Sequence, residues 1–135
     1  MDEREALRRL GEARVARMAT VDGEGAPHVV PVVFALDDRA IYWAVDQKPK
    51  RSLHLKRLDN LRANPAVQLV ADHYDEDWSS LWWIRATGQG RILEGGKERE
   101  RALQLLSEKY PQHREQPPDG AVVAIDITRL AWWEG

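Results

Sequence analysis

Apolar residues recur along this chain with two different spacings, which together predict a mainly β fold with flanking helices. Residues 2–13 have helical spacing, with Leu7 and Leu10 three positions apart among Glu and Arg. Residues 14–20 then alternate between apolar and polar, and the turn residues of segment 22–25 indicate a hairpin. We therefore expect a helix followed by an antiparallel sheet.

Five further strands follow from Val-rich and alternating runs. One strand is predicted over 28–36, where Pro31 indicates an edge position or a bulge because proline cannot donate to the ladder. Gly88 and Gly90 are typical of a bend or bulge in a curving sheet. The remaining strands are expected at residues 41–45, 66–74, 81–93 and 121–133. Six strands in hairpin order predict a closed or nearly closed antiparallel barrel.

Helical spacing returns twice between the strands. Leu55, Leu58 and Leu61 line one face of residues 52–61, and the following Asn-Pro pair ends this helix. Residues 95–110 are predicted to form an exposed helix. The prolines at 111, 117 and 118 then indicate a stiff loop before the last strand.

Composition narrows the class of protein. The length of 135 residues fits one domain over 1–135, and the net charge of −2 argues against a general nucleic-acid binder, which is normally basic. The absence of cysteine excludes disulfides, thiolate metal sites and a cysteine nucleophile. The first residues lack the apolar segment of a signal peptide, and no stretch approaches the roughly 18 apolar residues of a membrane span. We expect a soluble, cytoplasmic protein without membrane contact.

The strongest chemical feature is a local concentration of positive charge. Segment 48–52 lies where a strand is expected to end and a helix to begin, so backbone N–H groups, the helix dipole and cationic side chains can converge on one anion. This arrangement favours a phosphate site, while a solvated helix face and a nucleic-acid backbone site remain alternatives. The cations are Lys48, Lys50, Arg51, Lys56, Arg57 and Arg62, against Asp46 and Asp59.

Aromatic residues and histidines supply further candidates. Trp78, Trp82 and Trp83 follow an acidic loop, and an aromatic ring beside a phosphate can stack on a fused heterocycle, although core or interface packing is an equal alternative. The two strand neighbours among them point to opposite faces, so at most one of that pair lines a pocket. His28 is the best pocket candidate of the four histidines, whose spacing fits neither a zinc nor an iron site, and we predict no metal.

Several short sequence words occur in an order that resembles a known family. They are Arg17–Gly23, Pro27–Val32, Lys48–Arg51, Asn60–Val67 and Asp77-Trp78. Over nearly the whole chain this order resembles the pyridoxamine 5'-phosphate oxidase-like split-barrel superfamily, and most closely its deazaflavin-dependent class B branch. Arg129-Leu130 is not followed by the proline of the true pyridoxamine-phosphate oxidases, so the resemblance does not imply their activity.

The resemblance implies a six-stranded antiparallel split β-barrel that works as a homodimer, with coenzyme in two clefts built from both subunits. It also implies an oxidoreductase that uses coenzyme F420, an 8-hydroxy-5-deazaflavin, to transfer a hydride to a small unsaturated organic molecule. FMN is the alternative coenzyme. No catalytic side chain is assigned, because the coenzyme carries the hydride and the protein positions it.

The resemblance also assigns binding roles by position. Lys50, Arg51 and Ser52 are expected to hold the coenzyme phosphate, with Lys48 and Arg57 nearby. The ring system and its polyol chain are expected along His28, Val30, Pro31, Val32, Ala44 and Val45, with Trp78 arriving from the partner subunit.

Two other classes of function remain open. A non-catalytic coenzyme-binding or storage protein would bind coenzyme tightly without turnover. A nucleic-acid-binding barrel that uses the same basic segment would bind oligonucleotides in a salt-dependent way.

Overall fold

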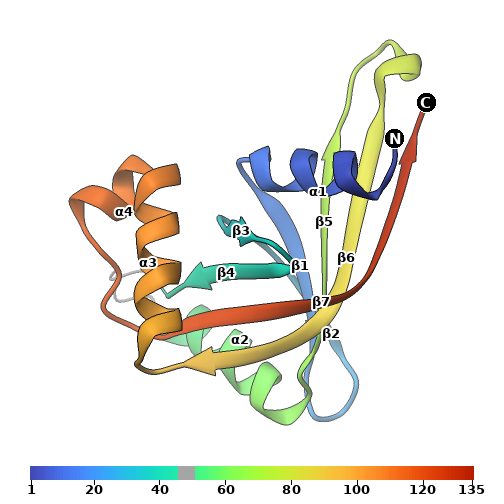
Figure 1. The fold of residues 1–135 in the computed structure, drawn as a ribbon. Coiled ribbons are helices and arrows are strands. Elements are labelled where there is room, and N and C mark those ends of the chain that lie inside the picture. Colours follow the sequence, from blue (N-terminus) through green and yellow to red (C-terminus); the bar gives the residue numbers. More distant parts are fainter. Residues whose placement is uncertain (46–50) are drawn as a thin grey trace.

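The computed structural model describes residues 1–45 and 51–135, without the side chains of residues 51–55, and contains one antiparallel sheet with flanking helices (Figure 1). The sheet order is β2-β1-β5-β6-β7-β4-β3. The elements are α1 (Glu3–Glu12), β1 (Ala16–Val21), β2 (Pro27–Val32), β3 (Ala35–Asp37), β4 (Ala40–Ala44), α2 (Arg51–Ala63), β5 (Ala66–His73), the 3₁₀ turn η1 (Trp78–Ser80), β6 (Trp82–Leu93), α3 (Lys97–Lys109), α4 (Pro111–Glu115) and β7 (Val122–Glu134). The predicted class, mainly β with flanking helices, is confirmed.

The predicted number of strands and the closure of the barrel are wrong. The sequence predicts one strand over 28–36, but the chain leaves the ladder at Val33 and Phe34, so β2 and β3 lie at opposite edges of the sheet. Phe34 is fully buried, its backbone N–H donates to the Tyr110 hydroxyl at 3.2 Å, and that hydroxyl lies 3.0 Å from the Phe34 carbonyl. These contacts replace ladder hydrogen bonds at the break. The described residues therefore form an open seven-stranded sheet, not a closed six-stranded barrel.

The long strands β6 and β7 are shared by both halves of the curved sheet (Figure 1). The first part of β6 pairs with β5, whereas the first part of β7 pairs with β4. The register between β6 and β7 shifts between Thr87 and Gly88, where any added Cβ would meet the backbone oxygen of Asp126. Only glycine permits this close approach, so the predicted bulge at Gly88 is confirmed.

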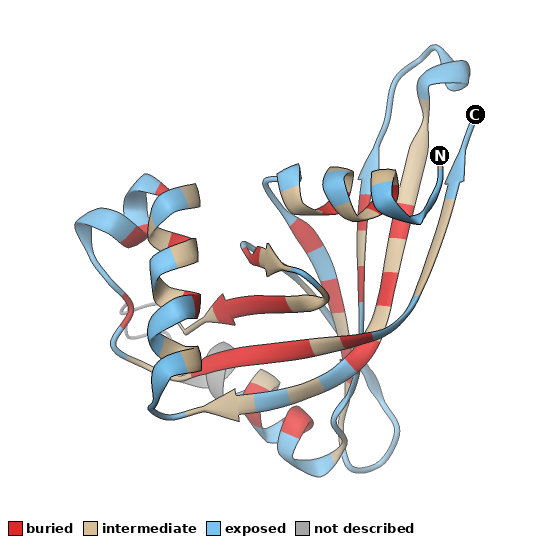
Figure 2. Ribbon diagram, viewed as in Figure 1, coloured by how far each residue is buried: buried red, intermediate tan, exposed pale blue. Residues whose placement is uncertain are grey.

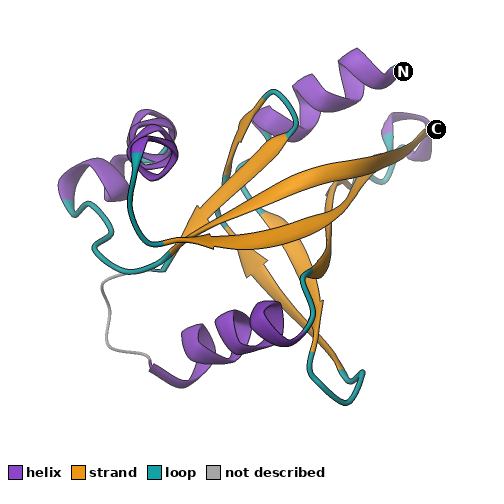
Figure 3. Ribbon diagram, turned by 60° about the horizontal axis from the view of Figure 1, so that its bottom comes forward, coloured by secondary structure: helices purple, strands orange, loops and turns teal. Residues whose placement is uncertain are grey.

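In β1 and β5, buried positions alternate with more exposed ones (Figure 2). In β1, for example, Met18 is fully buried while its neighbour Arg17 is exposed. In β4 and the first part of β7, consecutive residues are buried, because α3 packs on the second face of these strands. Helix α2 contacts β1 and β6, and α3 contacts β3, β4 and β7, so the helices surround the sheet (Figure 3). None of the helices among the described residues has the length and apolar character needed to cross a bilayer.

The loop predicted after residue 110 is wrong over residues 111–115, which form the helix α4. Pro111 occupies the start of this helix, where the missing N–H of proline is not needed for intrahelical bonding. Of the two alternatives predicted for Pro31, an edge position or a bulge, the edge position is confirmed, since β2 is an edge strand of the described sheet and pairs there with β1.

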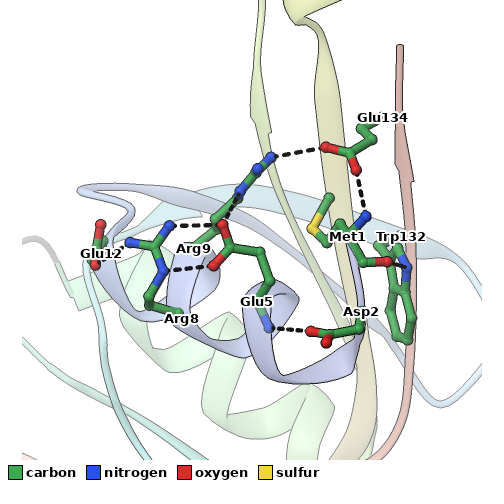
Figure 4. A network of polar contacts seen from close by, with 8 residues as sticks. All are labelled: Met1, Asp2, Glu5, Arg8, Arg9, Glu12, Trp132 and Glu134. Carbon is green, nitrogen blue, oxygen red and sulfur yellow. Dashed lines mark hydrogen bonds and ion pairs between the residues drawn. The ribbon is translucent and has the colours of Figure 1, made fainter.

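A polar network fastens α1 to the end of β7 (Figure 4). The ammonium group of Met1 forms an ion pair with Glu134, whose carboxylate also lies 3.4 Å from the Arg9 guanidinium. The Trp132 indole N–H donates to the Met1 carbonyl at 3.0 Å. The hydrogen bond from the Met1 ammonium is the largest cause of the lowered pKa of Glu134. We call Met1, Arg9, Trp132 and Glu134 the N-terminal clamp.

Candidate functional site

A cleft of about 220 Å³ lies between β2, β4, α2 and α4. Strand β2 is one edge of the sheet and β4 is next to the other edge, so the curvature of the open sheet brings them to the same cleft. Its lining residues are Pro31, Val32, Val33, Trp43, Ala44, Arg57 and His113. We call this site the β2–β4 cleft.

Arg57 is the cation of the β2–β4 cleft. Its neighbours Leu58 and Leu61 on α2 are buried in the core, which fixes the helix against the sheet. The Arg57 guanidinium carbon lies 5.7 Å from the centroid of the Trp43 ring. Burial lowers the pKa of Arg57, and its buried Nε has no hydrogen-bond partner among the described residues. A partly dehydrated guanidinium of this kind gains stability from an anionic ligand.

Trp43 carries the second unpaired donor of the cleft. It lies in β4 opposite Val123 of β7 and is only 1% exposed. Its buried indole Nε1 has no hydrogen-bond partner among the residues that the structure describes. Buried indole N–H groups usually find an acceptor in folded proteins. Two N–H donors without acceptors therefore belong to residues of one cleft, and both suit a ligand rich in oxygen.

The remaining lining is mostly apolar. Pro31, Val32, Val33 and Ala44 form the strand walls, and His113 from α4 is nearly buried, with its ring 5.9 Å from that of Tyr110. Apolar walls with a few polar groups are typical of ligand pockets. The volume is smaller than the roughly 300–1,000 Å³ of usual small-molecule sites, so a coenzyme-sized ligand would extend beyond it.

The cleft brings together Pro31, Val32, Ala44 and Arg57 of the sequence-predicted site residues. Three other predicted residues do not line it. Val30 and Val45 are partly buried against the core, and His28 lies opposite Thr20 of β1 with its buried Nδ1 unpaired among the described residues.

The predicted phosphate-binding residues lie at the edge of what the structure describes. Lys48 and Lys50 are outside the described residues, and so are the side chains of Arg51 and Ser52. The backbone of Arg51 begins α2, and Arg57 follows on the same helix. Helix α2 therefore supplies Arg57 to the cleft and has its N-terminus at Arg51. The assignment of Lys48, Lys50, Arg51 and Ser52 to phosphate binding stays a prediction.

Trp78 lies apart from the cleft of its own chain. It is 68% exposed on η1, in the hairpin between β5 and β6 that projects from the sheet (Figure 1). Its predicted arrival from a partner subunit stays a prediction. Trp82 packs partly against the core, whereas Trp83 stacks with Arg85, and neither lines the cleft.

Sequence reasoning missed Val33, Trp43 and His113. Trp43 falls within the predicted strand 41–45, but strand periodicity alone does not reveal that its N–H is unpaired. His113 falls in a segment predicted as a loop, which gives no side-chain direction. Among the described residues, no group of three or more His, Asp or Glu side chains is arranged to hold a metal ion.

The face of the sheet away from the core carries two further hollows, of about 260 and 320 Å³. Both include Ala19 of β1 and Gln68 of β5. Val29 on the neighbouring strand β2 is 61% exposed, and Trp133 at the end of β7 is 45% exposed. This outer face thus offers apolar surface next to the strand that lines the cleft.

Comparison with protein families identifies the class of protein. The profile of the family described as pyridoxamine 5'-phosphate oxidase matches residues 3–134, so the chain belongs to this family. Comparison with curated proteins gives no match.

Solved structures share the fold at low sequence identity. A conserved hypothetical protein from Mycobacterium tuberculosis has 22% identity and a TM-score of 0.78, with 99% of this chain and 85% of that chain covered. The heme storage protein HutZ from Vibrio cholerae has 15% identity and a TM-score of 0.72, covering 97% and 90%. The FAD binding protein from Mycobacterium smegmatis has 18% identity and a TM-score of 0.68, covering 100% and 98%. The fold therefore occurs in flavin-binding and in heme-binding proteins.

Proposed function

We propose that this protein is an oxidoreductase that binds coenzyme F420 in the β2–β4 cleft and transfers a hydride between the reduced deazaflavin and a small unsaturated organic substrate. FMN is the alternative coenzyme. The observation that carries the proposal is the partly buried Arg57, without an anionic partner among the described residues, in a mostly apolar cleft beside helix α2.

The donor set fits the phosphate and polyol portion of such a coenzyme. The N-terminus of α2 carries the positive end of the helix dipole, and residues 48–57 are rich in Lys and Arg. In the proposal, Lys50, Arg51 and Ser52 hold the phosphate, and Lys48 and Arg57 neutralise its charge. Each charge-assisted hydrogen bond contributes about 1.5–3 kcal/mol.

The apolar walls suit the ring side of the coenzyme. Pro31, Val32 and Ala44 carry no hydrogen-bonding side chain, so they exclude water from the space beside the donors. The coenzyme supplies the hydride chemistry, whereas this chain binds it, orients it and shields it from water. No titratable side chain is required as a catalytic acid in this proposal.

A homodimer is part of the proposal. The volume of the cleft in one chain is below that of usual ligand sites, and the outer face next to β2 is partly apolar. Tyr74 and Trp78 on the projecting hairpin are 63% and 68% exposed, so they are available to a second copy. Packing of two outer faces would bury this surface and bring a second chain to the open side of each cleft.

A second candidate is a non-catalytic protein that binds coenzyme or heme. The heme storage protein from Vibrio cholerae shares the fold, and His113 places an imidazole, a common heme ligand, in the cleft. This candidate predicts binding without turnover, or binding of heme in preference to a flavin.

Titration of the purified protein with coenzyme F420, FMN and heme in parallel tests these alternatives. The proposal predicts F420 binding, followed by turnover of reduced F420 with a member of a panel of enones, quinones and biliverdin-like tetrapyrroles. Submicromolar FMN binding without F420 binding would overturn the choice of coenzyme. Tight binding without turnover on any acceptor would instead support the storage candidate.

A further inference from the structure

We infer that the indole N–H of Trp43, which has no acceptor among the described residues, is a coenzyme-binding donor that an oxygen atom of the ligand accepts from. The inference rests on the proposed coenzyme site and adds a residue to it. It assigns a polar role to a side chain that sequence periodicity marks only as part of a strand.

The burial of Trp43 makes the unpaired N–H unusual. The side chain is 1% exposed, and neither the described protein atoms nor bulk water satisfies its only polar atom. A buried donor without an acceptor destabilises a folded protein. Trp132 shows the ordinary arrangement in the same chain, because its indole N–H donates to the Met1 carbonyl at 3.0 Å.

The neighbour of Trp43 points to the class of ligand. The Arg57 guanidinium lies over the indole, 5.7 Å from the ring centroid, and its own Nε is also buried and unpaired. A cation and a neutral N–H on adjacent cleft residues match a group with one anionic oxygen and further acceptor oxygens. A phosphate ester on a polyol chain has this chemistry.

The position of Arg57 also places an anionic ligand near the indole. Arg57 and Trp43 line the same cleft, so an anion held by the guanidinium has its remaining oxygens close to the indole N–H. Trp43 is thus a binding residue that becomes satisfied only when the coenzyme is present.

The test replaces the N–H while keeping the shape of the ring. Site-specific incorporation of 3-benzothienylalanine at position 43 retains a bicyclic aromatic side chain without the donor, and Trp43→Phe provides a second variant. Equilibrium dialysis measures the affinity for F420 and for FMN. We expect both variants to bind the preferred coenzyme about 10-fold more weakly than the wild type.

The matched control is Trp132→Phe, which removes an indole N–H outside the cleft and is expected to leave coenzyme affinity unchanged. Unfolding of each variant without coenzyme verifies the fold, and the benzothienyl variant is expected to unfold at the wild-type urea concentration or above it. Wild-type affinity in the benzothienyl variant would overturn the role of Trp43. A wild-type protein that binds neither coenzyme would overturn the proposed function itself.

Discussion

The N-terminal clamp and the β2–β4 cleft each contain a tryptophan, and the two differ in whether the indole N–H has a hydrogen-bond acceptor. Trp132 of the clamp donates to the Met1 carbonyl, and the neighbouring charges of Arg9 and Glu134 are paired. Trp43 of the cleft has no acceptor among the described residues. The Trp132 indole has its acceptor within the chain, whereas the donors of Trp43 and Arg57 in the cleft have none among the described residues.

Two partly buried cations show the same contrast. Lys109 donates to the Gly11 carbonyl at 3.0 Å and lies 4.2 Å from the centroid of the Phe34 ring. Arg57 contacts the Trp43 ring, but its buried Nε lacks an acceptor among the described residues. Polar groups without partners concentrate at binding sites, because stability alone favours pairing them. The paired groups of the clamp therefore stabilise the fold, whereas the unpaired donors of the cleft suit a ligand.

The largest effect is expected from removing the cations that precede and begin α2. Lys50→Ala combined with Arg51→Ala is expected to weaken coenzyme binding by up to several kcal/mol, since each charge-assisted hydrogen bond contributes about 1.5–3 kcal/mol. Equilibrium dialysis measures the loss. Arg4→Ala combined with Lys97→Ala removes the same charge from exposed positions of α1 and α3 and is expected to retain wild-type affinity. Unchanged affinity in the first variant would mean that the phosphate lies elsewhere.

A smaller effect, on stability instead of binding, is expected in the clamp. Trp132→Phe removes the hydrogen bond to the Met1 carbonyl and part of the ring that packs against the core. We expect the free energy of unfolding to fall by about 1–3 kcal/mol while coenzyme affinity stays constant. Urea unfolding and dialysis on the same preparation check both values. If Trp132→Phe lost as much coenzyme affinity as the Trp43 variants, the clamp and the cleft would not differ in their role in binding.

The smallest effect is a pH dependence of stability at Lys109. Burial, and secondarily the charge of Arg14, lower the pKa of Lys109 to about 8 from 10.5 in the unfolded chain. Between about pH 8 and pH 10.5 the unfolded chain binds more protons at this residue than the folded chain does. The contribution of Lys109 to the free energy of unfolding therefore rises with pH across this window, on the order of 1 kcal/mol after solvent screening.

Lys109→Met checks this sign by removing the titrating group. Urea unfolding of wild type and variant at pH 7.5, 9 and 10 is expected to show a stability difference that changes in favour of the wild type as pH rises. A difference that stays constant across these pH values would contradict the lowered pKa. Tyr42, with a pKa raised to about 12, acts in the opposite direction above pH 10, but it is present in both proteins and its effect cancels in the difference.

The sequence predicted those features of the sheet that depend on a single residue and its backbone. Pro31 at an edge and Gly88 at a bulge follow from a missing donor and a missing Cβ, and both are found. The break at Val33 and Phe34 was not predictable from local spacing, because the group that bonds the Phe34 backbone there, the Tyr110 hydroxyl, comes from a distant part of the chain.

The candidate site was predictable only in part for the same reason. Pro31, Val32, Ala44 and Arg57 were identified through the resemblance to the family, and they share one cleft. His113 joins them because α4, which packs against α3, carries it to the cleft, and no local spacing indicates this. The unpaired state of Trp43 depends on what surrounds its N–H in three dimensions.

The most direct test of the cleft follows the indole N–H resonances of protein labelled with ¹⁵N-tryptophan during titration with coenzyme, with Trp43→Phe and Trp132→Phe used for assignment. Binding in the β2–β4 cleft predicts that the Trp43 resonance shifts with the binding isotherm while the Trp132 resonance stays in place. A Trp43 resonance that does not move at saturating coenzyme would contradict the account, because the ligand would then bind outside this cleft.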